Sequence, residues 1–154
     1  MAVNEKLKAL AGNWKGTNRL NFGEDSGTPV IESPSTAEVL ERAGGQALEI
    51  TYTWEYEGKP QEGFLLINGD AGSGAVKAVF TDSFHLANDL MQCDGAATPD
   101  GGINVKGFYT VPGHPEWGWR TEITPGDDSF TYRMYNVTPE GAEEWAVETV
   151  FTRG

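Results

Sequence analysis

Two polar residues of the sequence have types and a spacing that suit proton transfer. Asp82 ends the segment 76–82, where the alternation of side chains points its carboxyl group to the same side as Phe80. His85 follows three residues later, and a buried aspartate beside an imidazole can fix its tautomer and make it a general base. The same spacing also suits a turn in which Asp82 accepts backbone N–H groups and His85 forms hydrogen bonds at the rim. The pair therefore predicts either a chemical site or a structural turn.

Aromatic residues share the side that the alternation predicts to face inward. Such a surface, with a few directed polar groups, suits a small hydrophobic, aromatic or lipid-like ligand. The alternative is that the rings fill the interior as an ordinary core, because large residues dominate cores. The residues that we predict to bind the ligand are Tyr52, Trp54, Phe80, Asp82, His85, Tyr109, Trp119 and Tyr132.

The histidines and the cysteine do not predict a metal site. His85 and His114 are separated widely in the chain and no carboxylate cluster has ligand spacing, so we predict no metal and no cofactor. Haem needs only one axial histidine, so a haem binder stays among the alternatives. Cys93 has no evident activating base, and we expect a small, partly buried thiol.

The charge of the chain argues against nucleic acid as a partner. There are 23 acidic and 11 basic residues, and the formal net charge of -12 repels phosphate backbones and anionic membrane surfaces. The acidic excess is concentrated in residues 116–148, where it indicates a solvated face or, as a second interpretation, a cationic ligand or partner. Within this region Arg120 either pairs with Glu122 on the outer face or faces the cavity and binds a ligand carboxylate.

Glycine and proline divide the chain into segments of strand length. The 20 glycines and 8 prolines cluster at intervals, and the segments between them are rich in β-branched and aromatic residues. Residues 48–57 show the clearest alternation, and residues 144–151 predict a second half-buried strand with Trp145 on its inner side. Strands with one wet and one dry face need a sheet that closes on itself or packs on another. At 154 residues, we predict one domain, 1–154, an all-β antiparallel meander β-barrel of about nine to ten strands.

Three other segments complete the predicted architecture. Val3, Leu7 and Leu10 have helical spacing, and Asn4 can cap a short N-terminal helix that covers one end of the barrel. A second short helical turn is predicted within residues 84–91. Residues 23–35 are polar and rich in proline, which predicts a long surface loop.

The two ends of the chain carry residues that can seal the barrel. The first and last strands of a closed antiparallel barrel pair, which can bring Arg153 over the ring of Trp14. Such a cation–π contact contributes about 0.5–2 kcal/mol. We therefore predict that Trp14 and Arg153 are the structural closure of the barrel.

These residues also carry a family resemblance. A Gly12-x-Trp14 strand after a short helix, with an arginine in the last strand, resembles the signature of the calycin superfamily, which holds the lipocalins and fatty-acid-binding proteins. Residues 81–85 (Thr-Asp-Ser-Phe-His) and 112–120 (Pro-Gly-His-Pro-Glu-Trp-Gly-Trp-Arg) resemble patterns of a bacterial lipocalin-like family called domain of unknown function 1579. The resemblance spans nearly the whole chain and implies a calycin-type barrel, with no activity implied. The chain departs from the family patterns at Phe84, His114 and Glu116.

The opening Gly12-x-Trp14-x-Gly16 is also similar to that of haem-binding nitrobindin-type barrels. This resemblance implies an axial histidine near the C-terminus, but residues 115–154 contain no histidine.

The function that we predict is the binding of a small hydrophobic or aromatic ligand inside a lipocalin-like barrel. One alternative is an enzyme that uses Asp82 and His85 for proton transfer on a bound small molecule. The other is a ligand-free scaffold or a haem binder. The composition sets no oligomeric state, so a monomer or a homodimer is expected.

The sequence also predicts where the protein works. Residues 1–6 lack the apolar core of a signal peptide, and a single cysteine cannot form an internal disulfide. No apolar stretch approaches the roughly 20 residues that span a bilayer. We therefore predict a cytoplasmic protein with no membrane and no nucleic acid partner.

Overall fold

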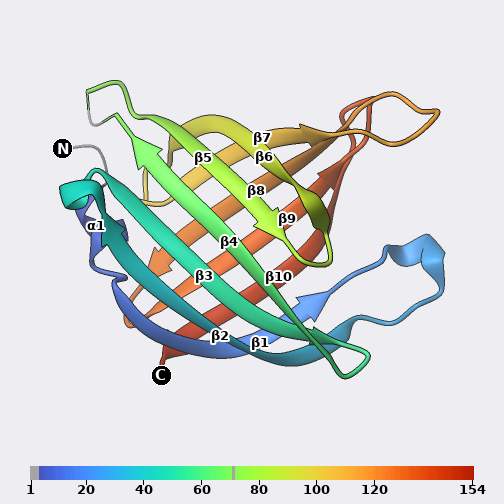
Figure 1. The fold of residues 1–154 in the computed structure, drawn as a ribbon, viewed down its shortest axis with the longest axis horizontal. Helices are drawn as coiled ribbons and strands as arrows, with labels where there is room; N and C mark the ends of the chain where they lie inside the picture. Colours follow the sequence, from blue (N-terminus) through green and yellow to red (C-terminus); the bar gives the residue numbers. More distant parts are fainter. Residues whose placement is uncertain (1–3, 71) are drawn as a thin grey trace.

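Ten strands pair in sequence order and close into a barrel in the computed structural model, which describes residues 4–70 and 72–154 (Figure 1). Every neighbouring pair is antiparallel, and β1 pairs with β10 to complete the ring. The predicted all-β meander barrel with a short N-terminal helix is confirmed. The elements are α1 (Glu5–Lys8), β1 (Gly12–Leu20), η1 (Glu24–Ser26), β2 (Ile31–Arg42), η2 (Ala43–Gly45), β3 (Ala47–Tyr56), β4 (Lys59–Gly69), β5 (Ala75–Asp82), β6 (Leu86–Ala97), β7 (Ile103–Tyr109), β8 (Trp117–Gly126), β9 (Ser129–Val137) and β10 (Glu143–Arg153).

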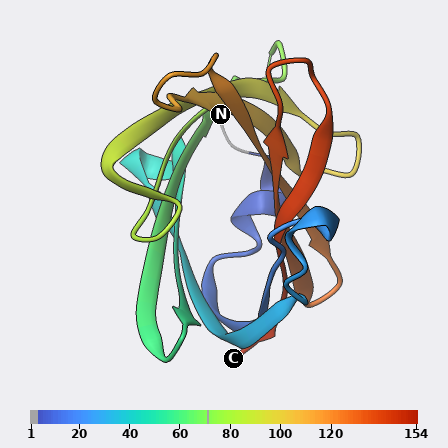
Figure 2. The same cartoon turned by 90° about the vertical axis from the view of Figure 1, so that its right-hand side faces the viewer.

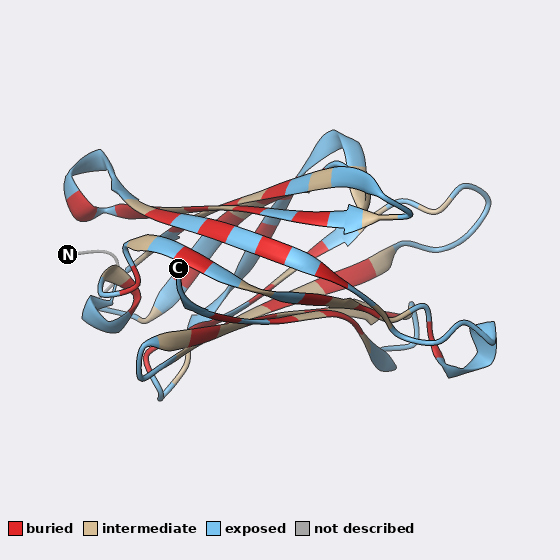
Figure 3. Cartoon of the chain, turned by 90° about the horizontal axis from the view of Figure 1, so that it is seen from below, coloured by how far each residue is buried: buried red, intermediate tan, exposed pale blue. Residues whose placement is uncertain are grey.

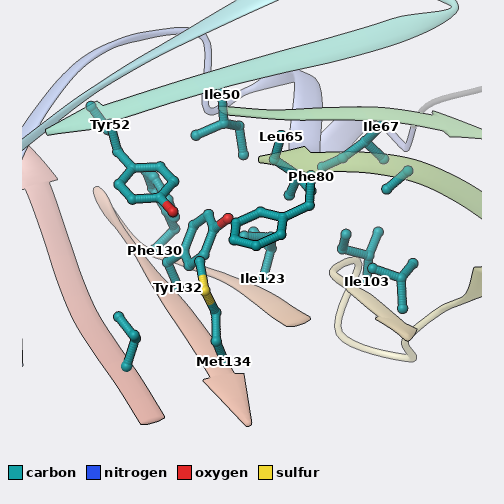
Figure 4. Close-up of a cluster of buried hydrophobic side chains, with 14 of the residues drawn as sticks. Ile50, Tyr52, Leu65, Ile67, Phe80, Ile103, Ile123, Phe130, Tyr132 and Met134 are labelled. Atoms are coloured by element: carbon teal, nitrogen blue, oxygen red, sulfur yellow. The ribbon is translucent and has the colours of Figure 1, made fainter. Parts of the chain in front are cut away.

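Buried and exposed side chains alternate along the strands, as the bands of colour in Figure 3 show. In β3, Leu48, Ile50 and Trp54 are buried, whereas Thr53 and Glu55 are exposed. The inward side chains of all ten strands belong to one hydrophobic core, part of which is drawn in Figure 4. Apolar burial of this kind is the main stabilising contribution to a barrel.

The helix α1 lies across one end of the barrel, which we call the closed end and which is visible behind the ring of strands in Figure 2. The side chain of Asn4 accepts a hydrogen bond from the Lys6 N–H at 2.8 Å and caps the helix. Leu7 and Leu10 are buried beneath it, whereas Val3, the third apolar position of the prediction, lies outside the described residues. Within residues 4–70 and 72–154, no helix is long and apolar enough to cross a membrane.

Arg153 joins the last strand to the closed end. Its guanidinium lies 4.0 Å from the centre of the Trp14 ring, so the predicted cation–π contact is present. The same guanidinium donates to the carbonyl oxygens of Ala11 at 2.9 Å and Ala9 at 2.8 Å. Trp14 donates its indole N–H to the carbonyl of Leu10 at 2.7 Å. The pairing of β1 with β10 and the docking of α1 thus use the same two side chains.

A β-bulge in β10 overturns the predicted orientation of Trp145. The register between β9 and β10 shifts between Trp145 and Val147, and Ala146 and Val147 are both buried. A bulge adds one residue to a strand and breaks the alternation on either side of it. Trp145 is therefore only half-buried, and its ring packs against the Arg19 guanidinium at 5.3 Å.

Two other segments differ from their predictions. The loop that begins at residue 21 ends at residue 30, because β2 starts at Ile31 and includes Pro34. The pairing of β2 with β3 begins at Thr36, so Pro34 lies beyond it, where a missing N–H costs least. Residues 84–91 form no helix, because β6 starts at Leu86 and pairs back onto β5 after a turn at 83–85.

Five connections gather at the other end of the barrel, which we call the open end. They join β1 to β2, β3 to β4, β5 to β6, β7 to β8 and β9 to β10, and they lie on the right in Figure 1 and toward the viewer in Figure 2. Among the described residues, the helical segment at this end is the single-turn 3-10 helix η1 in the β1–β2 connection. A ligand that enters the barrel therefore meets these connections first.

Candidate functional site

The carboxyl group of Asp82 is buried inside the barrel and accepts four hydrogen bonds. Its Oδ2 atom accepts from the Tyr52 hydroxyl at 2.6 Å and from the Trp54 indole N–H at 3.3 Å. Its Oδ1 atom accepts from the backbone N–H groups of Phe84 at 2.8 Å and His85 at 3.0 Å. All four partners are donors, which suits a carboxylate, because this group only accepts. Asp82 therefore ties the turn between β5 and β6 to the inner face of β3.

This turn places two ring side chains inside the open end. The His85 ring stacks on Trp54 with centres 5.3 Å apart and lies 5.1 Å from the Trp119 ring. Phe84 meets Trp54 edge-on at 5.2 Å. Asp82 contacts His85 only through the backbone, and no hydrogen bond joins its carboxylate to the imidazole in the part of the chain that is described. The geometry matches the turn-capping interpretation of Asp82 and lacks the bond that would set the histidine tautomer.

Burial determines the protonation of the inner groups. It lowers the pKa of the His85 imidazole, and the charge of Asp82 opposes this effect more weakly. Burial also raises the pKa of the Tyr52 and Tyr132 phenols well above the ordinary value, so both hydroxyl groups stay protonated at neutral pH. His85 is thus shifted toward its neutral form, which has one donor and one acceptor nitrogen.

Most of the predicted ligand-binding residues pack against one another in the interior. The rings of Tyr52 and Tyr132 lie 5.1 Å apart, and Figure 4 shows them converging beside Phe80 and Met134. Tyr109 is half-buried nearer the open end. At most 5% of the residue is exposed in five of the predicted residues, namely Tyr52, Trp54, Phe80, Trp119 and Tyr132. The inner half of the barrel is consequently filled with side chains.

A pocket of about 170 Å³ lies at the open end, and we call it the mouth pocket. It brings two of the predicted residues, His85 and Trp119, together with residues at the ends of β1, β9 and β10. An engineered cavity of similar size, about 150 Å³, binds benzene in another protein. The lining consists of Leu20, Asn21, Phe22, Phe84, His85, Trp119, Asn136, Glu144, Trp145 and Ala146.

The polar groups of the mouth pocket differ in how far they are already bonded. Asn21 donates to the Trp145 carbonyl at 2.8 Å, and the Asn136 carbonyl oxygen accepts from the Tyr109 hydroxyl at 2.5 Å. The indole N–H of Trp119 is buried and has no hydrogen-bond partner among residues 4–70 and 72–154. A buried donor without a partner costs about 1–3 kcal/mol. A ligand oxygen that accepts a hydrogen bond from this N–H would remove this free-energy cost.

A larger hollow of about 840 Å³, which we call the outer groove, lies on the outside of the barrel over β1 to β5. Several of its hydroxyl groups are already bonded: those of Thr36 and Thr53 lie 2.6 Å apart, and Ser83 donates to Gln61 at 2.7 Å. None of the buried unpaired polar side chains in the described residues belongs to it. Its outward side chains are Asn13, Lys15, Thr36, Glu38, Thr51, Thr53, Glu62, Phe64, Thr81 and Ser83.

The remaining reactive residues do not gather into a site. Burial raises the pKa of the Cys93 thiol to about 11, which leaves it un-ionised at neutral pH. His114 is exposed between β7 and β8. Arg120 faces outward and pairs with Glu122 and with Glu143 at 2.7 Å, which is the outward of its two predicted positions. No group of three His, Cys, Asp or Glu side chains that could hold a metal ion occurs in the described ranges.

Eight of the ten residues of the mouth pocket were not predicted from the sequence. They come from strand ends and connections, where the bulge near Ala146 and the turn at Phe84 redirect side chains. Phe22 carries the one usable signal in the sequence, because it is a large aromatic residue at the start of a polar loop. In the structure it is 41% exposed. Asn136 and Glu144 carry no signal in the sequence, because they reach the mouth pocket only when distant strands meet as the barrel closes.

A closed ten-strand barrel with a small pocket at one end defines this chain as a lipocalin-like barrel. Residues 2–153 match the family described as Protein of unknown function (DUF1579), and the chain belongs to this family. A search of curated proteins found no match. Among solved structures the chain is similar to the crystal structure of Rv2717c from M. tuberculosis, with a TM-score of 0.64, 15% identity and 99% of each chain covered. At that identity the likeness shows a shared fold.

The first prediction concerns Asp82. In Asp82→Asn, an amide NH₂ faces donors that the carboxylate accepted, so we expect the free energy of unfolding to fall by about 2–4 kcal/mol. The control is Asp94→Asn, which removes an exposed ion pair with Lys77 and should cost less than about 1 kcal/mol. Urea denaturation at pH 7 measures both variants. Equal stability of the two variants would show that the four hydrogen bonds do not hold the turn.

The second prediction concerns the pH dependence of stability. The pKa of His85 is lowered in the folded state, so the unfolded chain binds a proton at higher pH than the folded chain does. The stability contribution of neutral His85 is therefore complete above about pH 6.5 and is lost as the pH falls below that value, by at most about 1.4 kcal/mol per pH unit. We expect His85→Gln to remove this slope and His114→Gln, at an exposed position, to keep it. Urea denaturation between pH 7.5 and pH 5.5, values chosen to span about one unit on each side of 6.5, gives the slopes. An unchanged slope in His85→Gln contradicts the prediction.

Proposed function

We propose that this protein binds one small planar molecule, about the size of a single aromatic ring, in the mouth pocket. The observation that carries the proposal is a pocket of about 170 Å³ whose lining includes Trp119, the residue whose buried indole N–H is unpaired. Sites for small ligands combine apolar walls with a few directed polar groups. The mouth pocket has both.

The walls of the mouth pocket favour a flat apolar body. Leu20, Phe22 and Phe84 line it with apolar surface, and the edge of the His85 ring contributes one donor and one acceptor nitrogen when neutral. Asn136 uses its carbonyl oxygen to accept from Tyr109, which leaves its NH₂ group as a donor. Together with Trp119, these groups suit a ring that carries an oxygen acceptor.

The size of the mouth pocket favours a smaller ligand than a lipid. Pockets for drug-sized molecules usually measure about 300–1,000 Å³, whereas the mouth pocket measures about 170 Å³. The packed rings of Tyr52, Phe80 and Tyr132 leave the inner barrel occupied by protein. A long acyl chain or a haem macrocycle would need these rings to move, so neither fits this arrangement.

The two other functional hypotheses find less support. An enzyme that relies on Asp82 and His85 needs a carboxylate that orients the imidazole, and here the carboxylate is fully used by four other donors. A scaffold that works through its surface needs a contiguous apolar patch. The large exposed apolar residues are few: Phe22 and Val30 lie in the β1–β2 connection, Leu90 on β6, Phe108 on β7 and Val150 on β10.

The third prediction tests the proposal with p-cresol, a ring that carries a hydroxyl acceptor. The indole region of a ¹H–¹⁵N correlation spectrum contains one N–H signal for each of the five tryptophans. Titration with p-cresol should shift the Trp119 signal in a saturable way, and Trp119→Phe identifies that signal. A shift confined to the other indole signals, or no saturable shift, would contradict the proposal.

Two variants locate the bound ring. Ala146→Val adds methyl groups to the wall of the mouth pocket and should weaken p-cresol binding several-fold. Phe64→Ala removes apolar surface from the outer groove instead and should leave the affinity unchanged. The reverse pattern would place the ring in the outer groove. The same titration of both variants therefore distinguishes binding in the mouth pocket from binding in the outer groove.

A further inference from the structure

We infer that the ligand of the mouth pocket is an amine that is protonated at neutral pH, attached to a ring whose far side carries an oxygen acceptor. The inference rests on the proposed function and adds the chemical class of the ligand. It depends on one acidic side chain of the lining, on the charges around the open end, and on the donors at the buried side of the pocket.

Glu144 is the acidic side chain that lines the mouth pocket. Within the described residues its carboxylate has no ion pair or hydrogen bond, whereas Glu143 pairs with Arg120 and Glu148 pairs with Arg133. The neighbouring acids on β10 are thus neutralised by arginine, and the one at the pocket is not. An unneutralised carboxylate at the rim favours a ligand with a positive charge.

A glycine in the facing loop makes room for this carboxylate. Gly23, in the connection between β1 and β2, has a φ of 101° and lies directly against Glu144, so that a Cβ atom at position 23 would overlap the Oε1 atom. The connection closes over the carboxylate from the other side of the pocket. Glu144 therefore lies between β10 and the β1–β2 connection at the entrance of the mouth pocket.

The lining around Glu144 contains aromatic rings and no lysine. Phe22 and Phe84 line the same pocket, and aromatic faces attract ammonium groups. Trp145 is also in the lining, but Arg19 already occupies one face of its ring, and the charge of Arg19 is balanced by Glu148 at 3.0 Å. The entrance is thus suited to a small cation.

The charges of the five connections at the open end have one sign. Residues 21–30, 57–58, 83–85, 110–116 and 138–142 contain no lysine or arginine. A rim of one sign raises the local concentration of oppositely charged ligands and repels those of its own sign. The acidic residues of these connections are Glu24, Asp25, Glu57, Glu116 and Glu140.

The buried side of the mouth pocket offers hydrogen-bond donors, so it favours an oxygen acceptor instead of a cation. The Trp119 indole N–H has no partner among the described residues, and the Asn136 NH₂ group is a second donor. The buried indole N–H lacks an acceptor, and a hydroxyl or carbonyl oxygen can accept from either donor. A ring with an oxygen at one end and an ammonium at the other satisfies the buried donors and the entrance carboxylate together.

The fourth prediction uses three probes that differ in charge and share a 4-hydroxyphenyl ring: tyramine is a cation, 4-hydroxyphenethyl alcohol is neutral, and 4-hydroxyphenylacetate is an anion. Isothermal titration calorimetry at pH 7 and low salt should give tyramine the tightest binding, about tenfold tighter than the neutral alcohol, and the anion the weakest. Glu144→Gln should reduce the affinity for tyramine to that for the alcohol. Glu140→Gln removes the same charge from the adjacent β9–β10 connection, outside the pocket, and should keep most of the preference.

The outcomes of this experiment distinguish the two proposals. If the alcohol binds as tightly as tyramine, or if Glu140→Gln and Glu144→Gln have equal effects, the inference about the amine is wrong and the proposed function stands. If none of the three probes binds, the proposed function itself is wrong. Glu144 is exposed, so its substitution leaves the barrel core unchanged and the variant is expected to fold.

Discussion

The four hydrogen bonds to the buried carboxylate of Asp82 hold the turn that separates the filled inner half of the barrel from the mouth pocket. A carboxylate that is removed from water must keep its donors within reach, because an unsatisfied buried charge costs far more than the hydrogen bonds contribute. Two of the donors come from β3 and two from the turn after β5. The turn is therefore bound to β3, which is separated from β5 only by β4, and Phe84 and His85 lie inside the open end instead of projecting into water.

The remaining architecture follows from this arrangement. At the closed end, α1 and the contact between Trp14 and Arg153 cover the barrel. The aromatic core fills the interior from there toward the open end. Barrels of this strand number can hold one small ligand, and here the inward turn and the core border a small pocket at the mouth. Recognition thus depends on a small pocket whose buried side offers donors and whose entrance is acidic.

Much of the fold was predictable because it depends on local alternation. The pattern of β3 and the inward direction of Asp82 follow from spacing alone, and the contact between Trp14 and Arg153 follows from the pairing of the first and last strands. The bulge before Val147 was not predictable, because it depends on how β10 pairs with β9. The same limit applies to the site: His85 and Trp119 stand out by residue type, whereas Glu144 reaches the pocket only because distant segments meet at one end.

A crystal structure of the protein with p-cresol tests the central claim most directly. The account predicts the ring in the mouth pocket, with its hydroxyl oxygen within hydrogen-bonding distance of the Trp119 indole N–H and with Phe84 and His85 still held by Asp82. A ring bound in the outer groove would contradict this account. So would a ring in the inner barrel between Tyr52 and Tyr132 with the turn after β5 swung outward, because it would show that the four hydrogen bonds do not set the space available to a ligand.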